Sequence, residues 1–589
     1  MCIEINLVIK KYLSIYTLTM LPQLNLFISL IIKYLLFYFL IYLIGRSFVI
    51  IISLIYTQDK KLPKNIFGLK SSCFYPLIGL IITGNLLVLI NFFIPLKETA
   101  LLVILLLFLI ANLYFFNKEF FRHLVNFNFI FLYLIIPSIL IISTSDITFH
   151  YDAGYYHLNH QNWLRESNLI IGMINIFWAF GMSSVYEYIS AILWIDSSFV
   201  LIHFLSLYFV HLLYIFLTQK ALDKSSKLRY VSLFVLIYSI LDNFGFSGGR
   251  NGYIYIQEVG KQDVAVAILF FITTFVIAEI LILKKINKFD FLILSLMTFF
   301  IFQIKLSGIF IYLLFTYLIY SVLKNKLLNL KNIFVFLIPN IFFSIAWFAK
   351  SYLTTGCFVF PVNITCLNSF DWYIKNSTKD YQEISTNASF SYIQYYQNES
   401  LTFVDWFKDF FFSEQFADFS NYYTSFYSNF IISLIIILIL KKFFFLSTPI
   451  HSEVLKFLWI FALLNITYLI FFGPIPRYTM GILTVVIGLL GINVASEKIR
   501  IYNIIIYFLI FSSAFLLVRL NSYQKFYSTN ELALSDPRNF NDYYEEVVTY
   551  DNWIKPSNGD RCWVNLKCTM HKENIEIIEN RRFKTAYKK

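Results

Sequence analysis

Apolar runs of about twenty residues recur along almost the whole chain, and a run of that length can cross a bilayer as an α-helix. Of the 589 residues, 58% are hydrophobic and only 14% are charged. Soluble domains carry roughly 25% charged residues. The strict alternation that a membrane β-barrel needs is absent from the sequence. We therefore expect an all-α polytopic membrane protein.

Hydropathy predicts about 14 or 15 transmembrane helices. Residues 24–56 hold either one long span or two short ones. The other spans are expected at 74–96, 99–116, 127–144, 198–218, 230–243, 263–283, 289–303, 306–323, 332–349, 427–440, 455–473, 479–497 and 502–519. Gly172 and Gly181 interrupt the apolar stretch 169–194, which predicts two short helices along the membrane interface rather than a span.

Lysine and arginine gather in alternate loops, for example within 220–229, 284–288 and 324–331. Short basic loops lie on the cytoplasmic side of a membrane, so the formal net charge of +12 indicates orientation rather than a nucleic-acid partner. The loops at 145–197 and 350–425 are then expected outside.

The predicted organisation is a multi-span membrane domain over 1–519, followed by a small extracytoplasmic domain over 520–589. Cysteines fall as two closely spaced pairs in the outer segments, Cys357 with Cys366 and Cys562 with Cys568. On an oxidising side of the membrane these pairs predict two disulfides, and four unrelated thiols are the alternative.

The stretch FHYDAGYYHLNHQNW follows an early span and is unusually polar. On an α-helix, Asp152, Tyr155, Tyr156 and Asn159 share one face, and His157 and His160 lie on a neighbouring face. Asp152 can accept a proton from an alcohol at the membrane surface. The alternatives are an interfacial helix whose Tyr and Trp side chains lie in the aromatic belt, with Asp152 as a cap, or a metal site built by Asp152 and the two histidines.

Two further segments supply polar groups to the outer side. Asn175 and Glu187 lie in the interrupted stretch 169–194, which forms either a platform over Asp152 or a plain connector. The glycine-containing loop 244–262 leads to Asp263, which is either a polar group of the site or the cap of the next span.

Lys305 and Arg477 lie in predicted outer turns. Lysine there opposes the positive-inside trend, so Lys305 is either functional or a snorkelling side chain. The turn GPIPRY holds Arg477 between prolines and the next span, where a guanidinium can bind a lipid phosphate with two hydrogen bonds. A simple interfacial anchor is the alternative.

These pieces resemble the GT-C class of membrane glycosyltransferases, and more narrowly a largely uncharacterised family of bacterial polytopic membrane proteins. The resemblance rests on the order of five segments from about 130 to 570: YDAGYYHLNHQNWLRESNLIIGMINI, FQIKLSG, WFAKSYLTTGCFVFPVNITC, GPIPRYTMG and GDRCWVNLKC. The chain departs from the family where EVGKQD replaces a serine- and proline-rich stretch before Asp263, and where Lys350 replaces the usual arginine.

The resemblance implies transfer of a sugar from a polyprenyl-phosphate donor to a glycan, lipid or protein acceptor at the outer face of the bacterial inner membrane. Asp152 would act as the base, and Arg477 and Lys305 would stabilise the leaving phosphate. The implied substrate-binding or supporting residues are His157, Tyr155, Tyr156, His160, Trp163, Asn175, Glu187, Lys350 and Asp263. No cofactor is implied, and a divalent metal is left open.

Two rival functions remain open at this point: a polymerase or ligase of surface polysaccharide, and a flippase or transporter of a lipid-linked glycan. A transporter predicts charged groups in mid-span. Among the few such charges are Lys33 and Glu279, neither with an evident partner in the sequence.

Overall fold

The computed structural model describes residues 2–56, 63–97, 99–100, 102–104, 106, 108, 130–143, 149, 151–194, 200–243, 259–367, 369–373, 378, 381, 408, 412, 417–447, 453–472, 475–497, 544–546, 553–556, 561–569, 575–580 and 583–588. The longer helices in these ranges are α1 (Cys2–Tyr56), α2 (Tyr75–Asn91), α9 (Val200–Leu222), α10 (Arg229–Asn243), α11 (Asp263–Leu283), α12 (Lys288–Ile304), α13 (Ile311–Lys324), α14 (Leu330–Thr355), α18 (Ala417–Phe444), α19 (Glu453–Phe472) and α20 (Pro476–Ile492).

Shorter helical pieces lie between them: η1 (Ser71–Cys73), η2 (Phe131–Ile135), α6 (Ile136–Ser143), η4 (Ala153–His157), α7 (Leu158–Glu166), η5 (Met173–Asn175), η6 (Trp178–Met182), α8 (Val185–Ala191), η7 (Leu306–Gly308) and η8 (Asn363–Thr365). The strands are β1 (Asn65–Ile66), β2 (Leu69–Lys70), β3 (Phe445–Ser447), β4 (Val494–Glu497), β5 (Tyr544–Glu546), β6 (Ile554–Pro556), β7 (Ile575–Asn580) and β8 (Phe583–Lys588). They pair in sequence order as antiparallel two-stranded sheets.

Helix α11 lies at the centre of the bundle. Its most apolar window is 89% buried, and it packs against α9, α12, α13 and α20. The corresponding window of α14 is only 22% buried, and α13, α18 and α19 are similarly exposed. A helix that is apolar all round and still exposed fits a lipid environment.

Seven of the described helices are long and apolar enough to cross a membrane, which agrees with an integral membrane protein. The predicted total of about 14 or 15 spans is not reached within the described residues. The predicted segments at 74–96, 230–243, 289–303 and 479–497 are helices of only 15 to 17 residues, and 127–144 holds the short pieces η2 and α6. Hydropathy cannot separate a buried helix from a full span. The span predicted at 502–519 and most of the one at 99–116 lie outside the described residues.

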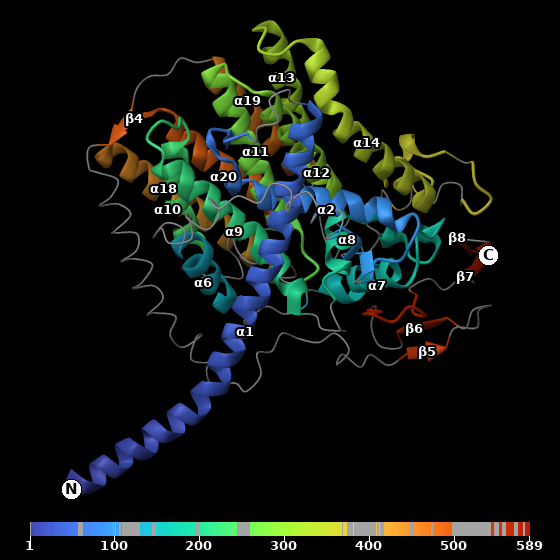
Figure 1. Cartoon of the computed structure of the whole chain (residues 1–589), viewed down its shortest axis with the longest axis horizontal. Coiled ribbons are helices and arrows are strands. Elements are labelled where there is room, and N and C mark those ends of the chain that lie inside the picture. The colour runs from blue at the N-terminus through green and yellow to red at the C-terminus, as the bar shows by residue number, and fades with distance from the viewer. Residues whose placement is uncertain are drawn as a thin grey trace.

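One continuous α1 covers residues 24–56, and its N-terminal end projects from the body (Figure 1). Its crossing with α2 depends on two glycines. A Cβ on Gly45 would lie 1.9 Å from Tyr75 O, and a Cβ on Gly79 would lie 1.9 Å from Ile41 O. Only glycine allows the two backbones to approach so closely.

Glu279 has a partner, contrary to the expectation from the sequence. Its carboxylate accepts hydrogen bonds from Lys220 Nζ at 2.5 Å and from Ser226 Oγ at 2.7 Å. Lys220 also donates to Phe67 O at 2.7 Å, and Phe67 N donates to Asp290 at 2.8 Å. This buried cluster joins the β1–β2 hairpin to α9, α11 and α12, so it has a structural explanation.

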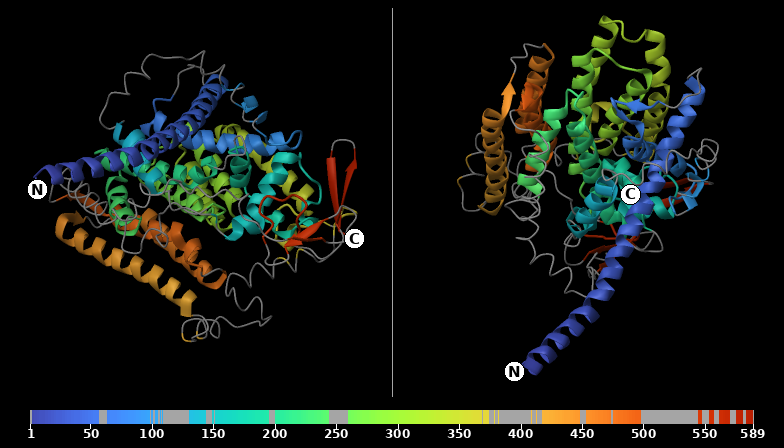
Figure 2. Two further views of the ribbon diagram at one scale, coloured as in Figure 1. Left: turned by 90° about the horizontal axis from the view of Figure 1, so that it is seen from below. Right: turned by 60° about the vertical axis from the view of Figure 1, so that its left-hand side comes forward.

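The C-terminal strands pack on the interrupted stretch 169–194, beside α7 and α8 (Figure 2). Ile171 N donates to Lys584 O and Ala586 N donates to Ile171 O, both at 2.9 Å. Gly172, at φ 67°, lies against β8, since a Cβ there would be 2.8 Å from Ala586 O. The stretch 169–194 contains only the short elements η5, η6 and α8, and most of it is buried.

Candidate active site at the helix ends

A cavity of about 480 Å³ lies where several long helices end or begin. Its walls include the starts of α11 and α20 and the ends of α12, α14 and α19. The basic loops that predict the cytoplasmic side lie at the other ends of α11, α12, α13 and α14. The cavity therefore occupies the end of the bundle that the charge pattern predicts to be outside.

The polar lining of this cavity combines residues that are far apart in the sequence. The ionisable side chains that line it are Asp152, His157, Lys261, Asp263, Lys305, Lys350 and Arg477. Aromatic side chains complete the wall, among them Tyr151, Tyr155, Tyr156, Trp178, Trp347 and Tyr478. A volume of a few hundred Å³ with convergent polar groups is typical of a small-molecule site.

Asp152 and His157 reach the same cavity because the helix widens between them. Residues 153–157 form a π-turn, closed by a hydrogen bond from Leu158 N to Ala153 O. Gly154 O instead accepts a hydrogen bond from Trp563 N at 2.9 Å. The expected α-helical face is therefore wrong in part: His157 lines the cavity, whereas Asn159 donates to Asn565 O in the C-terminal segment. Single π-turns are frequent at functional sites.

Lys261 is placed next to Asp152 by a close approach of two backbones. Phe149 forms a parallel bridge with Val259, and Gly260 follows at φ 93°. A Cβ on Gly260 would lie 2.8 Å from Ala153 Cβ, so a larger residue would separate the segments. Lys261 Nζ then donates to Asp152 Oδ2 at 2.5 Å. Burial and the charge of Arg477 lower the pKa of Lys261 to about 8, although Asp152 and Asp263 act in the opposite direction.

Asp263 pairs with both residues that were predicted to bind the phosphate, Lys305 and Arg477, and it does not cap α11. It is the first residue of that helix, and one of its oxygens accepts from Lys305 Nζ at 2.5 Å. Arg477 Nε lies 3.6 Å from the other oxygen. Lys305 Nζ and the Arg477 guanidinium lie 4.2 Å and 5.4 Å from the centre of the Tyr478 ring. Among the residues that the structure describes, one carboxylate thus pairs with two cations, which leaves excess positive charge at this wall.

Glu187 connects the two histidines behind the cavity. Its Oε1 pairs with His157 Nδ1, and its Oε2 lies 2.7 Å from His160 Nδ1. Burial raises the pKa of Glu187, but the charge of His160 and hydrogen bonds from both histidines outweigh burial and lower it overall. Ser184 N also donates to Glu187 in a capping box at the start of α8. Glu187 therefore orients His157, which lines the cavity, rather than contacting a ligand itself.

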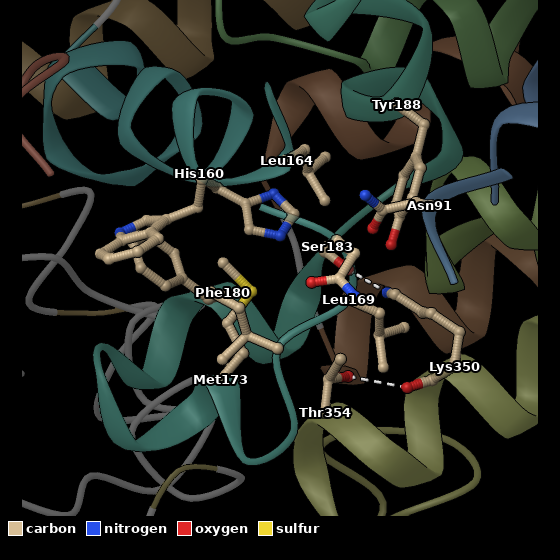
Figure 3. Close-up of a pocket in the computed structure, with 13 residues that line it drawn as sticks. Asn91, His160, Leu164, Leu169, Met173, Phe180, Ser183, Tyr188, Lys350 and Thr354 are labelled. Carbon is tan, nitrogen blue, oxygen red and sulfur yellow. Dashed lines mark hydrogen bonds between the residues drawn. The ribbon is translucent and has the colours of Figure 1, made fainter. Parts of the chain in front are cut away.

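Three other predicted residues lie away from the main cavity. Asn175 donates to Trp372 O and Ala586 O, which ties η5 to neighbouring segments. Trp163 is buried with its ring centre 6.2 Å from that of Trp553. His160 lines a small cavity behind the main one, together with Ser183 and Lys350 (Figure 3).

Lys350 lies in the last turns of α14, and not at the start of the predicted loop 350–425, because the helix continues to Thr355. Two disulfides, Cys357–Cys366 and Cys562–Cys568, stabilise segments next to the site. No cluster of three or more His, Cys, Asp or Glu side chains able to hold a metal ion occurs in the described part of the chain.

Tyr478 and Ser183 were not predicted from the sequence. Tyr478 directly follows Arg477, so an aromatic side chain beside a basic one was the available signal. Ser183 has no such signal, because its contact with Lys350 joins positions 167 residues apart.

Comparison with known families places the chain in a family. A family model described as a domain of unknown function, DUF8201, covers residues 27–484. The chain belongs to this family. Neither a curated protein nor a solved structure matches the chain. The part matched includes all the ionisable residues of the cavity and ends before the C-terminal strands.

Proposed function

We propose that the protein is a membrane glycosyltransferase that moves a sugar from a polyprenyl-phosphate donor to an acceptor hydroxyl. The observation that carries this proposal is the convergence of one candidate base, Asp152, with Lys305 and Arg477 in a single cavity at the helix ends. A base for a hydroxyl and cations for a phosphate are the two requirements of such a transfer.

The wall formed by Asp263, Lys305 and Arg477 suits the donor phosphate. Asp263 holds the two cations in place, and its single charge cannot neutralise both. A phosphate between them would accept charge-assisted hydrogen bonds, which are roughly twice as strong as neutral ones. The exposed apolar helices beside the cavity fit a lipid environment, in which the hydrocarbon chain of the donor would lie.

In the proposed reaction, the acceptor hydroxyl loses its proton to the Asp152 carboxylate as its oxygen attacks the anomeric carbon. The bond from that carbon to the phosphate oxygen breaks, and its electron pair remains on the phosphate. Configuration at carbon inverts, by the single-displacement logic of inverting glycosidases. Lys305 and Arg477 stabilise the charge that develops on the phosphate. Lys261 holds Asp152 in position until the acceptor binds.

Aromatic side chains offer faces for the sugar and the acceptor. The rings of Tyr151 and Tyr155 are stacked with centres 5.6 Å apart, and those of Trp178 and Tyr381 with centres 5.7 Å apart. Burial and the charge of Asp152 raise the pKa of Tyr156 well above 10, so this phenol stays neutral beside the base.

The test uses the full-length protein in lipid nanodiscs with a panel of hexoses linked to polyprenyl monophosphate or diphosphate, and it measures the released polyprenyl phosphate or diphosphate by mass spectrometry. Asp152→Asn should reduce release by about 10²- to 10⁴-fold, the usual contribution of a general base. Asp371→Asn is the matched control, since Asp371 is exposed and does not line the cavity. Release at the wild-type rate by Asp152→Asn would remove Asp152 as the base. Movement of donor across the membrane without release would favour a flippase.

A further inference from the structure

Lys350 is a buried ammonium that no carboxylate binds in the described part of the chain. Its side chain is 3% exposed, and its Nζ donates to Ser183 Oγ (Figure 3). The rings of Trp347 and Tyr188 flank it, with centres 4.6 Å and 5.6 Å from Nζ. A buried cation is costly unless an anion or several acceptors compensate it. Lys350 is therefore suited to an anionic ligand.

Glu187 lies behind the cavity, and its negative charge attracts the Lys350 ammonium. Both oxygens of Glu187 are already engaged by His157 and His160. Glu187 also does not line the main cavity, whereas Lys350 does. The carboxylate that could pair with Lys350 is thus committed elsewhere.

The charges that line the cavity are unequal. Among the described residues they are four cations and two carboxylates, with Asp152 bound to Lys261 and Asp263 shared by Lys305 and Arg477. The two excess positive charges lie at separate places, one at the Lys305–Arg477 wall and one at Lys350. A single ligand that neutralises the excess charge at both places needs two linked anionic groups.

The two places lie at the same level of the bundle. Phe302, near the end of α12, contacts Phe348 in α14 with ring centres 6.1 Å apart. Lys305 follows Phe302 by one turn, and Lys350 follows Phe348 by two residues. Ser183 and Ser351 add hydroxyl groups to the wall beside Lys350.

We propose that the donor carries a diphosphate: Lys305 and Arg477 bind the phosphate on one side of the bridging oxygen, and Lys350 binds the other. This inference rests on the proposed function and specifies its substrate class. The anomeric C–O bond would break with its electrons on the diphosphate, which gains one negative charge as the acceptor proton moves to Asp152. The product would be a polyprenyl diphosphate.

The test needs no knowledge of the sugar. Binding of farnesyl phosphate and farnesyl diphosphate to the full-length protein in nanodiscs is measured by titration calorimetry. Wild type should bind the diphosphate about 10- to 100-fold more tightly, the effect of one added hydrogen-bonded ion pair. Lys350→Met keeps the packing against Trp347. This variant should lose the preference for the diphosphate but should bind the monophosphate as tightly as wild type. Lys331→Met, at the exposed start of the same helix, should change neither.

Lys350→Arg is measured alongside, because Lys350→Met can fail to fold; the arginine keeps the charge and should keep the preference. If wild type binds the monophosphate as tightly as the diphosphate, the inference is overturned. An unchanged preference for the diphosphate in Lys350→Met also overturns it. Loss of the preference in Lys350→Arg with monophosphate binding intact also overturns it. Binding of neither lipid to wild type would instead refute the proposed function.

Discussion

Replacement of Glu187 by glutamine tests the structural role of the carboxylate that bridges two histidines. Glu187 is 1% exposed, and both of its oxygens contact histidine nitrogens. Glutamine replaces one carboxylate oxygen by an NH₂ group, which is a donor, so at least one imidazole N–H would face another donor. Removing one partner of a buried charged network costs about 3–5 kcal/mol. We expect Glu187→Gln to lower the unfolding free energy by that amount at pH 7.

The matched control is Glu166→Gln on α7. Glu166 lies 2.8 Å from Lys97, and both side chains are more than 40% exposed. An exposed pair of this kind contributes about 0–1 kcal/mol. Unfolding of both variants and wild type is measured by titration with SDS in mixed micelles. A loss in Glu187→Gln no larger than that in Glu166→Gln would refute the buried bridge.

The pH dependence of this effect has a defined sign. The pKa of folded Glu187 lies below its ordinary value of 4.5, so the folded state binds fewer protons than the unfolded state. Its stabilising contribution is therefore complete above about pH 4.5 and is lost as the pH falls further. The difference in unfolding free energy between wild type and Glu187→Gln should therefore decrease as the pH falls below about 4.5.

Two further predictions concern the π-turn and the lysine beside Asp152. Gly154→Ala should destabilise the packing of the C-terminal segment by about 1–3 kcal/mol, because a Cβ would lie 2.9 Å from the Trp563 ring; faster proteolysis of that segment would show it, and unchanged proteolysis would contradict it. Lys261 has a pKa of about 8 when folded and 10.5 ordinarily, so the folded state loses this proton first and stability should rise between about pH 8 and 10. Lys261→Met should reduce that rise in the same SDS titration.

Several features of the site could be predicted because they follow from membrane topology. Asp152, Lys305 and Arg477 lie at helix ends on one side of the predicted bilayer, and a compact bundle brings such ends together. The apolar run at 263–283 likewise located α11 at its observed bounds. These predictions needed only hydropathy and loop charge.

Other features depend on tertiary contacts and carry no local signal. The π-turn forms where the C-terminal segment supplies Trp563 N, and the pairing of Asp152 with Lys261 spans 109 residues. Glu187 is an intermediate case. Its place three residues after Ser184 is a capping-box signature, but its contacts with two histidines appear only when α7 packs against α8.

The distribution of charge separates structural from functional roles. Lys220 and Glu279 form a buried pair whose charges cancel, and this pair ties a hairpin to the bundle. At the cavity, by contrast, one carboxylate pairs with both Lys305 and Arg477, and among the described residues Lys350 contacts a hydroxyl and two aromatic rings but no carboxylate. A pair with balanced charge stabilises the protein without a ligand, whereas unbalanced buried cations are stabilised when an anion binds. Occupancy by the donor phosphate should therefore stabilise the fold as well as position the reaction, since a ligand that binds only the folded state raises its stability.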